Sequence, residues 1–328
     1  SDLTLYNGNK RLKTIQQEKL NNQMAELDVA TSENNIQESI AQVYIQILYA
    51  AESVKVNENT LQVSIAQRDR GQELLNAGSI AKSDLAQLEA QVSTDRYQLV
   101  TAQATLEDYK LQLKQLLELD GENEMNIYLP ALSDENVLAP LPTKRDVYIS
   151  ALSLRPEIEA SKLNVEASEL GINIAKSSYF PTISLSAGIG TNHTSGSDFT
   201  FGEQVKNGWN NSIGLSVSVP IFNNRQTKSA VQKAKLQYET SMLSLLDEQK
   251  ALYKTIESLW LDANSAQQRY AAANEKLKST QISYELISEQ FNLGMKNTVE
   301  LLTEKNNLLQ AQQEQLQAKY MAILNTQL

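Results

Sequence analysis

Four long stretches of the chain contain neither glycine nor proline: 9–70, 79–120, 221–293 and 295–328. Because these two residues interrupt helices, runs of this length predict very long helices. The longest run has 73 residues and would extend roughly 110 Å at 1.5 Å per residue. All six prolines lie between residues 130 and 220. This distribution argues against a compact α/β enzyme.

The composition excludes several kinds of functional site. The chain has no cysteine and a single histidine, His193, so thiol chemistry and a histidine or cysteine metal site have no support. Its net charge of −10 disfavours nucleic acid as a partner. No constellation of residues predicts a catalytic centre, and none predicts a cofactor or a metal. No run of apolar residues is long enough for a membrane-spanning helix, a test that leaves membrane β-strands open.

A repeat with a fixed offset of 216 residues links the two halves of the chain. Within 7–85, twelve residues recur unchanged at this offset, without an insertion. Asn76 and Gly78, for example, recur as Asn292 and Gly294. We interpret this pattern as a tandem duplication.

Each copy predicts a helical hairpin, in which a long helix reaches a tight break and a second helix runs back. Gly78 and Gly294 stand at the two breaks, where glycine is a common helix C-cap because it adopts the left-handed conformation without strain. Ser83 and Thr298 follow as expected N-caps of the returning helices. In the last helix, apolar residues recur every seven positions, which favours helix-against-helix packing. The other faces are polar, as either a solvated surface or the lining of a water-filled passage would be.

The middle of the chain breaks the helical pattern. Residues 119–144 predict an irregular linker, and 145–154 and 156–178 predict two helices. The apolar period then changes to two, which predicts strands near 183–189 and 213–221, each about as long as a tilted strand that crosses a bilayer. A soluble hairpin with one buried face would show the same alternation. The aromatic residues at the strand ends are Tyr179, Phe180, Trp209 and Phe222.

Three passages resemble the TolC-like outer-membrane efflux proteins. An Arg-Pro-Glu-Ile helix start at 155–158 leads to Tyr-Phe-Pro-Thr-Ile-Ser-Leu at 179–185, like the family's entry into a barrel strand. Val-Ser-Val-Pro-Ile-Phe-Asn at 217–223 resembles its strand-to-helix junction, and 3–8 resembles the first copy of that junction. The resemblance covers essentially the whole chain, including the duplication.

The resemblance implies a mainly α-helical fold with a small β part, in the outer membrane of a Gram-negative bacterium. In a homotrimer the long hairpins would form an α-barrel in the periplasm, and each subunit would give four transmembrane strands to a shared 12-stranded β-barrel in contact with outer-membrane lipid. The implied function is a passive exit duct, not an enzyme, of a tripartite efflux or type I secretion system. Its partners would be a periplasmic adaptor protein and an inner-membrane transporter. The alternatives are a periplasmic adaptor and a soluble coiled-coil scaffold.

The expected organisation divides the chain into four segments. We expect the counterpart of 155–185 in the first repeat to lie before residue 1, together with a signal peptide, which predicts about a hundred further N-terminal residues. The segments are a first repeat at 1–118 with its tip near 76–84, an equatorial linker with a short helix at 119–155, a helix and two transmembrane strands at 156–222 with an external loop at 192–211, and a second hairpin at 223–328 with its tip near 292–300.

The resemblance also implies roles at the hairpin tips. Glu300, Lys296 and Phe291 match positions that constrict the family's channel, and Asp84 is a weaker candidate in the first repeat. Thr303 stands where a second acidic residue is often found. Threefold symmetry would turn Glu300 into a ring of three charges that selects cations. Alternatively, Glu300 only favours a helix N-terminus. The turn residues, which would also dock the adaptor, are Gly78, Gly294, Asn76 and Asn292.

Overall fold

The computed structural model describes residues 1–119, 127–128, 137–196 and 198–327. The chain forms two compact units, which are Ser1–Thr31 with Ile149–Leu252 and Ser32–Tyr148 with Tyr253–Leu328. Each unit thus combines parts of both repeats. The four-segment division follows the order of the chain and stays a prediction.

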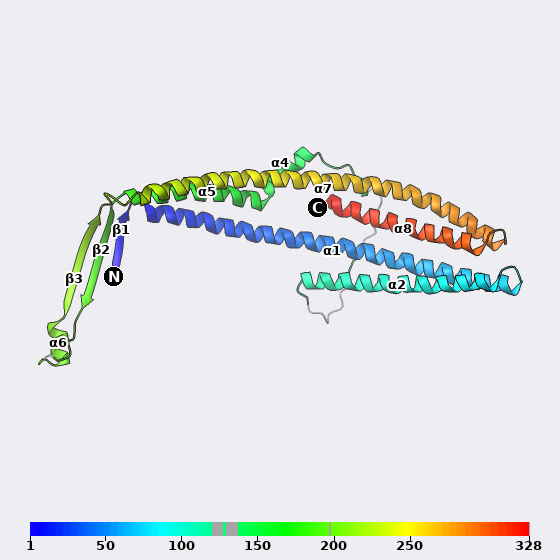
Figure 1. Ribbon diagram of the computed structural model, residues 1–328, viewed down its shortest axis with the longest axis horizontal. Helices are drawn as coiled ribbons and strands as arrows, with labels where there is room; N and C mark the ends of the chain where they lie inside the picture. The colour runs from blue at the N-terminus through cyan, green and yellow to red at the C-terminus, as the bar shows by residue number, and fades with distance from the viewer. Residues whose placement is uncertain (120–126, 129–136, 197, 328) are drawn as a thin grey trace. The chain divides into compact units, whose positions relative to one another are not determined.

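Four long helices dominate the fold (Figure 1). They are α1 (Lys10–Asn76), α2 (Lys82–Leu116), α7 (Gln226–Asn292) and α8 (Thr298–Gln327). Both α1 and α7 have 67 residues, and their first and last residues are each 216 positions apart, as are the first residues of α2 and α8. The glycine and proline pattern therefore predicted the helices, although α1 continues through Gly71, and the structure repeats at the predicted offset. We call α1 with α2 hairpin 1, and α7 with α8 hairpin 2.

Two further helices lie in the middle of the chain, as predicted. They are α4 (Lys144–Leu154) and α5 (Pro156–Lys176), and a 3₁₀ turn, η1 (Ser177–Tyr179), follows. Proline begins α5, where its missing N–H costs nothing because the first turn has no intrahelical acceptor. Most of the predicted irregular linker, 119–144, lies outside the described residues.

One three-stranded antiparallel sheet belongs to the first unit, in the order β1, β2, β3. The strands are β1 (Asp2–Asn7), β2 (Thr182–Gly190) and β3 (Asn210–Ser218). The alternating pattern predicted β2 correctly but extended the third strand to residue 221. The strand ends earlier, before Pro220, which has no N–H to donate to a neighbouring strand.

The sheet has one apolar and one small polar face. Leu3, Leu185 and Leu215 lie in one row across the three strands, whereas Ser184 pairs with Ser216 on the other face. The apolar face is not covered, since Leu215 is 66% exposed and every residue of β3 is exposed. A soluble hairpin, the alternative explanation of the alternating pattern, would bury its apolar face, but the described residues leave this face uncovered.

The predicted external loop at 192–211 contains a short helix, α6 (Phe201–Asn207), which the sequence analysis missed. Thr200 and Glu203 form a capping box at its start. The His193 ring contacts Phe201, and its Nδ1 lies 3.0 Å from Gln204 Oε1. None of the helices that the structure describes is long and apolar enough to cross a membrane.

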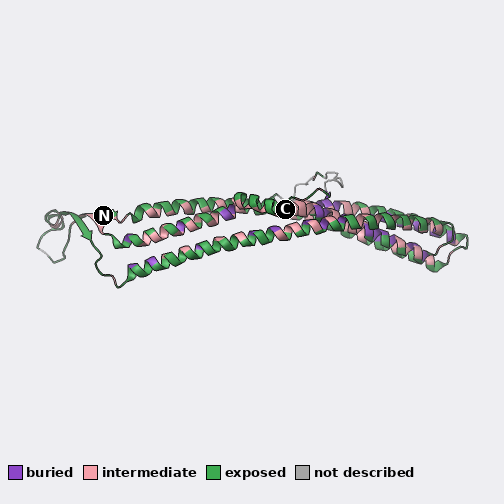
Figure 2. Ribbon diagram, turned by 90° about the horizontal axis from the view of Figure 1, so that it is seen from above, coloured by how far each residue is buried: buried purple, intermediate pink, exposed green. Residues whose placement is uncertain are grey.

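Buried residues of the second unit gather where the helices of the two hairpins pack together (Figure 2). One cluster joins Leu48 of α1 to Leu316 and Tyr320 of α8. Another joins Tyr270 of α7 to Ala322 of α8. The Leu48 cluster therefore joins the two hairpins, whereas the Tyr270 cluster lies within hairpin 2.

Candidate functional site

Both hairpin tips end their long helix with the same glycine turn. Gly78 and Gly294 have φ of +71° and +73°. The Gly78 N–H donates to the Leu75 carbonyl at 2.9 Å, and the Gly294 N–H donates to the Phe291 carbonyl at 2.9 Å. The next N–H in each turn donates to the carbonyl one residue further back, Ser79 to Leu74 and Met295 to Gln290. Each turn is therefore a complete Schellman motif. The predicted role of these glycines as helix C-caps is confirmed.

Replacing Gly294 by alanine should lower the free energy of unfolding by about 1–2 kcal/mol, because the left-handed conformation is costly for an L-residue. No atom lies within 4 Å of the added Cβ, so the loss reports the backbone conformation and not a clash. Urea unfolding followed by circular dichroism measures it. Gly202→Ala is the matched control, since Gly202 also has open space but a negative φ. An equal loss in both variants would contradict the prediction.

The two turn asparagines bond differently. Asn76 Oδ1 accepts a hydrogen bond from the Gln72 amide at 3.0 Å, within its own helix. The Asn292 carbonyl oxygen instead accepts one from Arg70 of hairpin 1 at 3.2 Å. The structure thus places the Asn292 turn beside hairpin 1, whereas the adaptor-docking role of these residues stays a prediction.

The acidic tip residues cap the returning helices. Asp84 accepts a hydrogen bond from the Ala81 N–H at 3.0 Å. Glu300, its counterpart 216 positions later, accepts one from the Asn297 N–H at 3.2 Å, while Asn297 Oδ1 accepts the Glu300 N–H at 2.9 Å. Both carboxylates therefore stabilise a helix start, the alternative considered for Glu300.

The predicted N-caps, Ser83 and Thr298, are wrong. Ser83 is the second residue of α2, and Thr298 is the first of α8, so both lie inside their helices. Asn297 provides the cap of α8 instead. The Thr298 hydroxyl is buried without a hydrogen-bond partner. Asparagine is a better N-cap than threonine, so the residue types of these two neighbours favour Asn297.

Lys296 and Glu300 form an ion pair at the tip of hairpin 2. Their charged atoms are 2.5 Å apart, and the side chains are 32% and 40% exposed. The Lys296 hydrogen bond, followed by that of the Asn297 N–H, lowers the pKa of the Glu300 carboxyl. Glu300 therefore stays ionised at a lower pH than an unpaired glutamate does, and the Lys296 ammonium partly neutralises its charge.

Phe291 lies in a packed cluster and not at an open surface. Its side chain is 2% exposed and contacts buried leucines of both hairpins. The buried members of this cluster are Leu74, Leu88, Phe291 and Leu301. The structure thus places Glu300, Lys296 and Phe291 at the tip of hairpin 2 and Asp84 at the tip of hairpin 1. The Phe291 side chain, however, packs in the core.

A buried charged network, which the sequence analysis missed, joins the two hairpins near the tips. Lys305 of α8 donates hydrogen bonds to the Asp95 carboxylate of α2 and to the Ser64 hydroxyl of α1. Ser64 also donates to Asp95. The Gln91 amide donates to the second Asp95 oxygen at 2.9 Å. Three helices are therefore held at one point by a carboxylate and an ammonium.

This pair is unusual in its burial. The Asp95 and Lys305 side chains are 1% and 4% exposed, and it is the only ion pair of the described residues in which both are buried. Burial lowers the pKa of the Lys305 ammonium, and Asp95 opposes that change. Removing one partner would leave the other as an isolated buried charge.

The sequence did contain a signal for this network. In α2, Asp95 stands between Val92 and Leu99 at the three- and four-residue steps of the apolar stripe. In α8, Lys305 stands four residues after Leu301 at a buried position. Opposite charges at core positions of two packing helices predict a buried pair.

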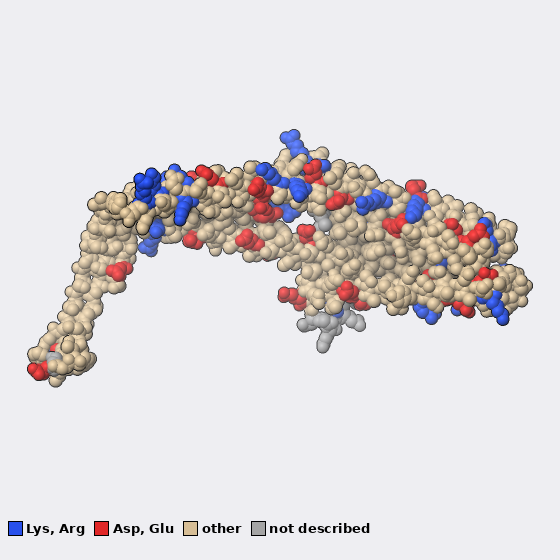
Figure 3. All heavy atoms as spheres, in the orientation of Figure 1, with Lys and Arg blue, Asp and Glu red and all other residues tan. Residues whose placement is uncertain are grey.

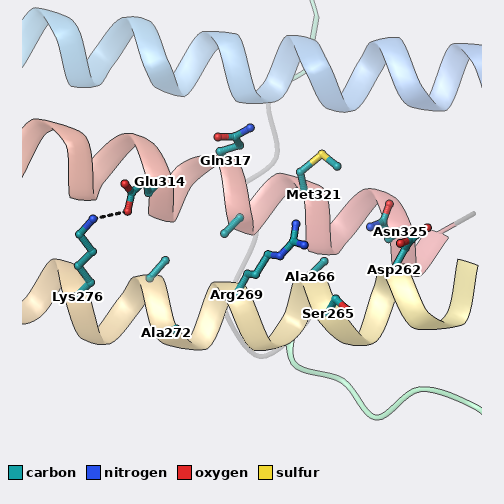
Figure 4. A pocket seen from close by; sticks show the side chains of 12 residues that line it. Asp262, Ser265, Ala266, Arg269, Ala272, Lys276, Glu314, Gln317, Met321 and Asn325 are labelled. Carbon is teal, nitrogen blue, oxygen red and sulfur yellow. Dashed lines mark hydrogen bonds and ion pairs between the residues drawn. The ribbon is translucent and has the colours of Figure 1, made fainter.

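A groove runs between the helices of each hairpin at equivalent positions. In hairpin 2 it has a volume of about 700 Å³ and is lined by Ala266, Ala318 and the Arg269 side chain (Figure 4). In hairpin 1 the equivalent groove, lined by Ala50 and Ala102, has about 320 Å³. These alanines are 216 positions from their counterparts, so the duplication extends to surface shape.

Charged residues of both signs alternate along the helices, whereas the strands carry almost none on the face drawn in Figure 3. Among the strand residues only Asp2 is charged. The exposed apolar face of the sheet suits apolar surroundings, whereas the mixed-charge faces of the helices suit water.

Comparison with known proteins agrees with this architecture. The family model described as "Outer membrane efflux protein" matches residues 147–326. Outer membrane efflux protein BepC of Brucella suis is 24% identical over 294 residues, which cover 89% of this chain and 61% of that protein. Outer membrane protein TolC of Escherichia coli K12 is also 24% identical, over 87% of this chain and 58% of its own. The chain thus spans about three fifths of the length of these relatives.

Solved structures share the fold. A crystal structure of CusC matches 99% of this chain and 74% of its own with a TM-score of 0.84 and 18% identity. The outer membrane protein VceC from Vibrio cholerae matches 99% and 76%, with a TM-score of 0.79 and 16% identity. Since the family model covers more than half of its residues, the chain belongs to the outer membrane efflux protein family and is located in the outer membrane.

Proposed function

We propose that the protein forms the outer-membrane exit duct of a tripartite efflux or type I secretion system in a Gram-negative bacterium. It would act as a passive conduit and not as an enzyme. The observation that carries this proposal is the combination of two equivalent long hairpins with a sheet that exposes an apolar face. Membership of the family supports it.

The sheet supports contact with outer-membrane lipid. Side chains such as Ile213 and Val217 are 84% and 60% exposed, and the opposite face consists mainly of serine and glycine. An apolar face suits lipid, and a small polar face suits a water-filled interior. The outer edges of β1 and β3 have no neighbouring strand among the described residues, and a closed barrel in a homotrimer would pair them.

The helices support a periplasmic duct. Their polar faces suit an aqueous passage, and hairpin tips held by matching glycine turns suit docking to a periplasmic adaptor that is coupled to an inner-membrane transporter. The adaptor alternative expects one hairpin and not two equivalent ones. The scaffold alternative leaves the uncovered apolar sheet face unexplained.

Reconstitution tests the proposal directly. The full-length protein, purified in detergent, should be a trimer by native mass spectrometry and should give discrete conductance steps in a planar lipid bilayer. A monodisperse species that is soluble without detergent and gives no conductance would overturn it.

The tip carboxylate should influence which ions pass. Glu300→Gln removes one negative charge per subunit and leaves the Lys296 ammonium uncompensated, so the permeability ratio of cations to anions should fall severalfold. Because the Glu300 pKa is lowered, the wild-type ratio should be lost at a lower pH than the ordinary pKa of an exposed glutamate would give. Glu275→Gln, an exposed change about five turns before Gly294, serves as the control. An unchanged ratio in Glu300→Gln would exclude a role in selectivity.

A further inference from the structure

Basic side chains gather where the helices of the first unit adjoin the sheet. The register pairs the last residue of β1 with the first of β2, and the first of β2 with the last of β3, so all three strands meet the helices at one end of the sheet. The segments at this end, 8–17, 170–181 and 219–238, hold eight of the 29 basic residues of the chain and none of its 39 acidic ones. We call these eight residues the basic belt: Lys10, Arg11, Lys13, Lys176, Arg225, Lys228, Lys233 and Lys235.

The basic belt is not neutralised by the rest of the described chain. None of its members forms an ion pair with another described residue. Seven of the eight residues are exposed, and only Lys13 is partly buried. On the face drawn in Figure 3, basic atoms gather at the part of the helices beside the sheet. A protein with a net charge of −10 thus concentrates positive charge at one place.

Local structure does not favour these charges. Lys10, Arg11 and Lys13 lie in the first turn of α1, where the helix dipole disfavours cations. Arg225 has a φ of +63°, and its counterpart in the first repeat is Asn9, with a φ of +64°. Asparagine adopts this left-handed conformation more readily than arginine does. Positive charge held at positions that the backbone disfavours indicates that a negative partner outside the chain compensates it.

The surroundings of the basic belt indicate which partner this is. The exposed apolar face of the sheet ends at Tyr179 and Phe222, which are 55% and 83% exposed, and the belt follows. This order, apolar then aromatic then basic, matches the hydrocarbon, the interface and the anionic surface of a membrane. We propose that the basic belt binds the phosphate groups of anionic phospholipids in the leaflet at the helix end of the sheet. This inference rests on the contact between sheet and membrane lipid in the proposed function.

The depth of the basic belt agrees with such a surface. Its last member, Lys235, lies nine residues after Gln226, the first residue of α7, which is about 14 Å along the helix at 1.5 Å per residue. The headgroup region of one leaflet is about 5–7 Å thick. The attraction of the anionic surface extends a further Debye length, about 8–10 Å at 0.1–0.15 M salt. The whole belt therefore lies within the field of the headgroups.

The two repeats carry the positive charge at different positions. At the offset of 216 residues, Lys10 corresponds to Gln226. Conversely, Lys228 corresponds to Leu12. A ligand of fixed shape would need equivalent groups in equivalent places, whereas mobile headgroups need only a sufficient density of charge. The arrangement therefore favours a fluid layer of phosphates over a single bound anion or a folded acidic partner.

The preference for anionic lipid can be measured by electron spin resonance. The full-length protein is reconstituted in phosphatidylcholine vesicles that contain a trace of spin-labelled phosphatidylglycerol or spin-labelled phosphatidylcholine. The immobilised fractions give the relative association constant of the two labelled lipids. The wild-type protein should prefer phosphatidylglycerol about three- to fivefold at about 20 mM salt, and this preference should approach one at about 0.5 M salt because the attraction is screened.

Three sets of substitutions test the basic belt itself. The first set removes four of its charges and should bring the preference close to one: Lys10→Gln, Arg11→Gln, Arg225→Asn and Lys228→Gln. The second set removes four exposed cations of the other unit that form no ion pair with a described residue, and should leave the preference unchanged: Lys55→Gln, Lys82→Gln, Arg96→Gln and Lys254→Gln. The third set keeps the charge and should keep the preference: Lys10→Arg, Arg11→Lys and Lys228→Arg. Arg225→Asn alone should not lower stability, because Asn9 has the same conformation in the first repeat.

The outcomes separate this inference from the proposed function. If the vesicles show immobilised lipid but the wild-type protein does not prefer phosphatidylglycerol, or the first set keeps the preference, the inference is wrong and the membrane contact stands. If no lipid is immobilised at all, the membrane contact and the inference both fail. Inorganic phosphate at constant ionic strength should not change the preference. Its loss under that condition would show a site for free phosphate and would overturn the proposal.

Discussion

Lys305→Met should lower the free energy of unfolding by about 3–5 kcal/mol, because it leaves the Asp95 carboxylate buried without its ammonium. Methionine keeps most of the side-chain volume, so the loss reports the charge and not a cavity. The Ser64 and Gln91 hydrogen bonds would remain, but neither carries a positive charge. Urea unfolding of the protein in detergent, followed by circular dichroism, measures the change.

Two controls separate burial from ion pairing as such. Lys276→Met breaks a comparably short ion pair, with Glu314, in which the side chains are 46% and 41% exposed, and should cost about 0–1 kcal/mol. The double variant Asp95→Leu with Lys305→Met removes both charges and should recover most of the loss. A Lys305→Met variant as stable as Lys276→Met would show that the Asp95 charge is not isolated in the folded protein.

The recovery expected for the double variant raises the question of why a buried pair is present at all. An apolar pair would hold the helices together equally well. The stripes of α2 and α8, however, repeat similar apolar residues at regular steps, so one turn resembles the next. A charge on each helix has one matching position, and a shift by a turn would leave both Asp95 and Lys305 unpaired. We therefore expect the network to select one register, as single polar residues do in coiled coils.

The long helices could be predicted because glycine and proline act locally. Their absence from 226–292 is enough to allow one uninterrupted helix, and the offset of 216 residues then fixes its partner at 10–76. The strands were predictable for the same reason, since the period of two is a local property. Their ends were less so, because Pro220 ends β3 through a missing hydrogen bond to a neighbouring strand.

Contacts between the hairpins could not be predicted from local sequence as the helices were, because they depend on which helix faces meet. Asp95 and Lys305 are 210 positions apart, and each alone looks like an exception in an apolar stripe. The tip shows the same limit. Resemblance to a family located Glu300 and Phe291 at the tip of hairpin 2, but it did not indicate that Glu300 caps α8 or that the Phe291 side chain turns into the core.

Phe291→Ala distinguishes the two roles that this residue could have. In the core it contacts Leu74 and Leu88 of hairpin 1 and Leu301 of hairpin 2, so its loss should lower the free energy of unfolding by about 3–5 kcal/mol. A side chain that faced a channel constriction would contribute little to stability, and its removal would instead raise conductance. Measuring both quantities on the same variant therefore decides between packing and constriction.

The control for this experiment lies two residues further on. Leu293→Ala removes an apolar side chain from the same turn, but that side chain is 69% exposed, so stability should change by no more than about 0.5 kcal/mol. A larger loss in Leu293→Ala than in Phe291→Ala would mean that the tip packs differently from this structure. If Phe291→Ala behaves as expected, the tip of hairpin 2 is anchored to hairpin 1 by both an apolar cluster and the Lys305 pair. Opening the tip would then require both contacts to yield, which makes their combined variants more unstable than either alone.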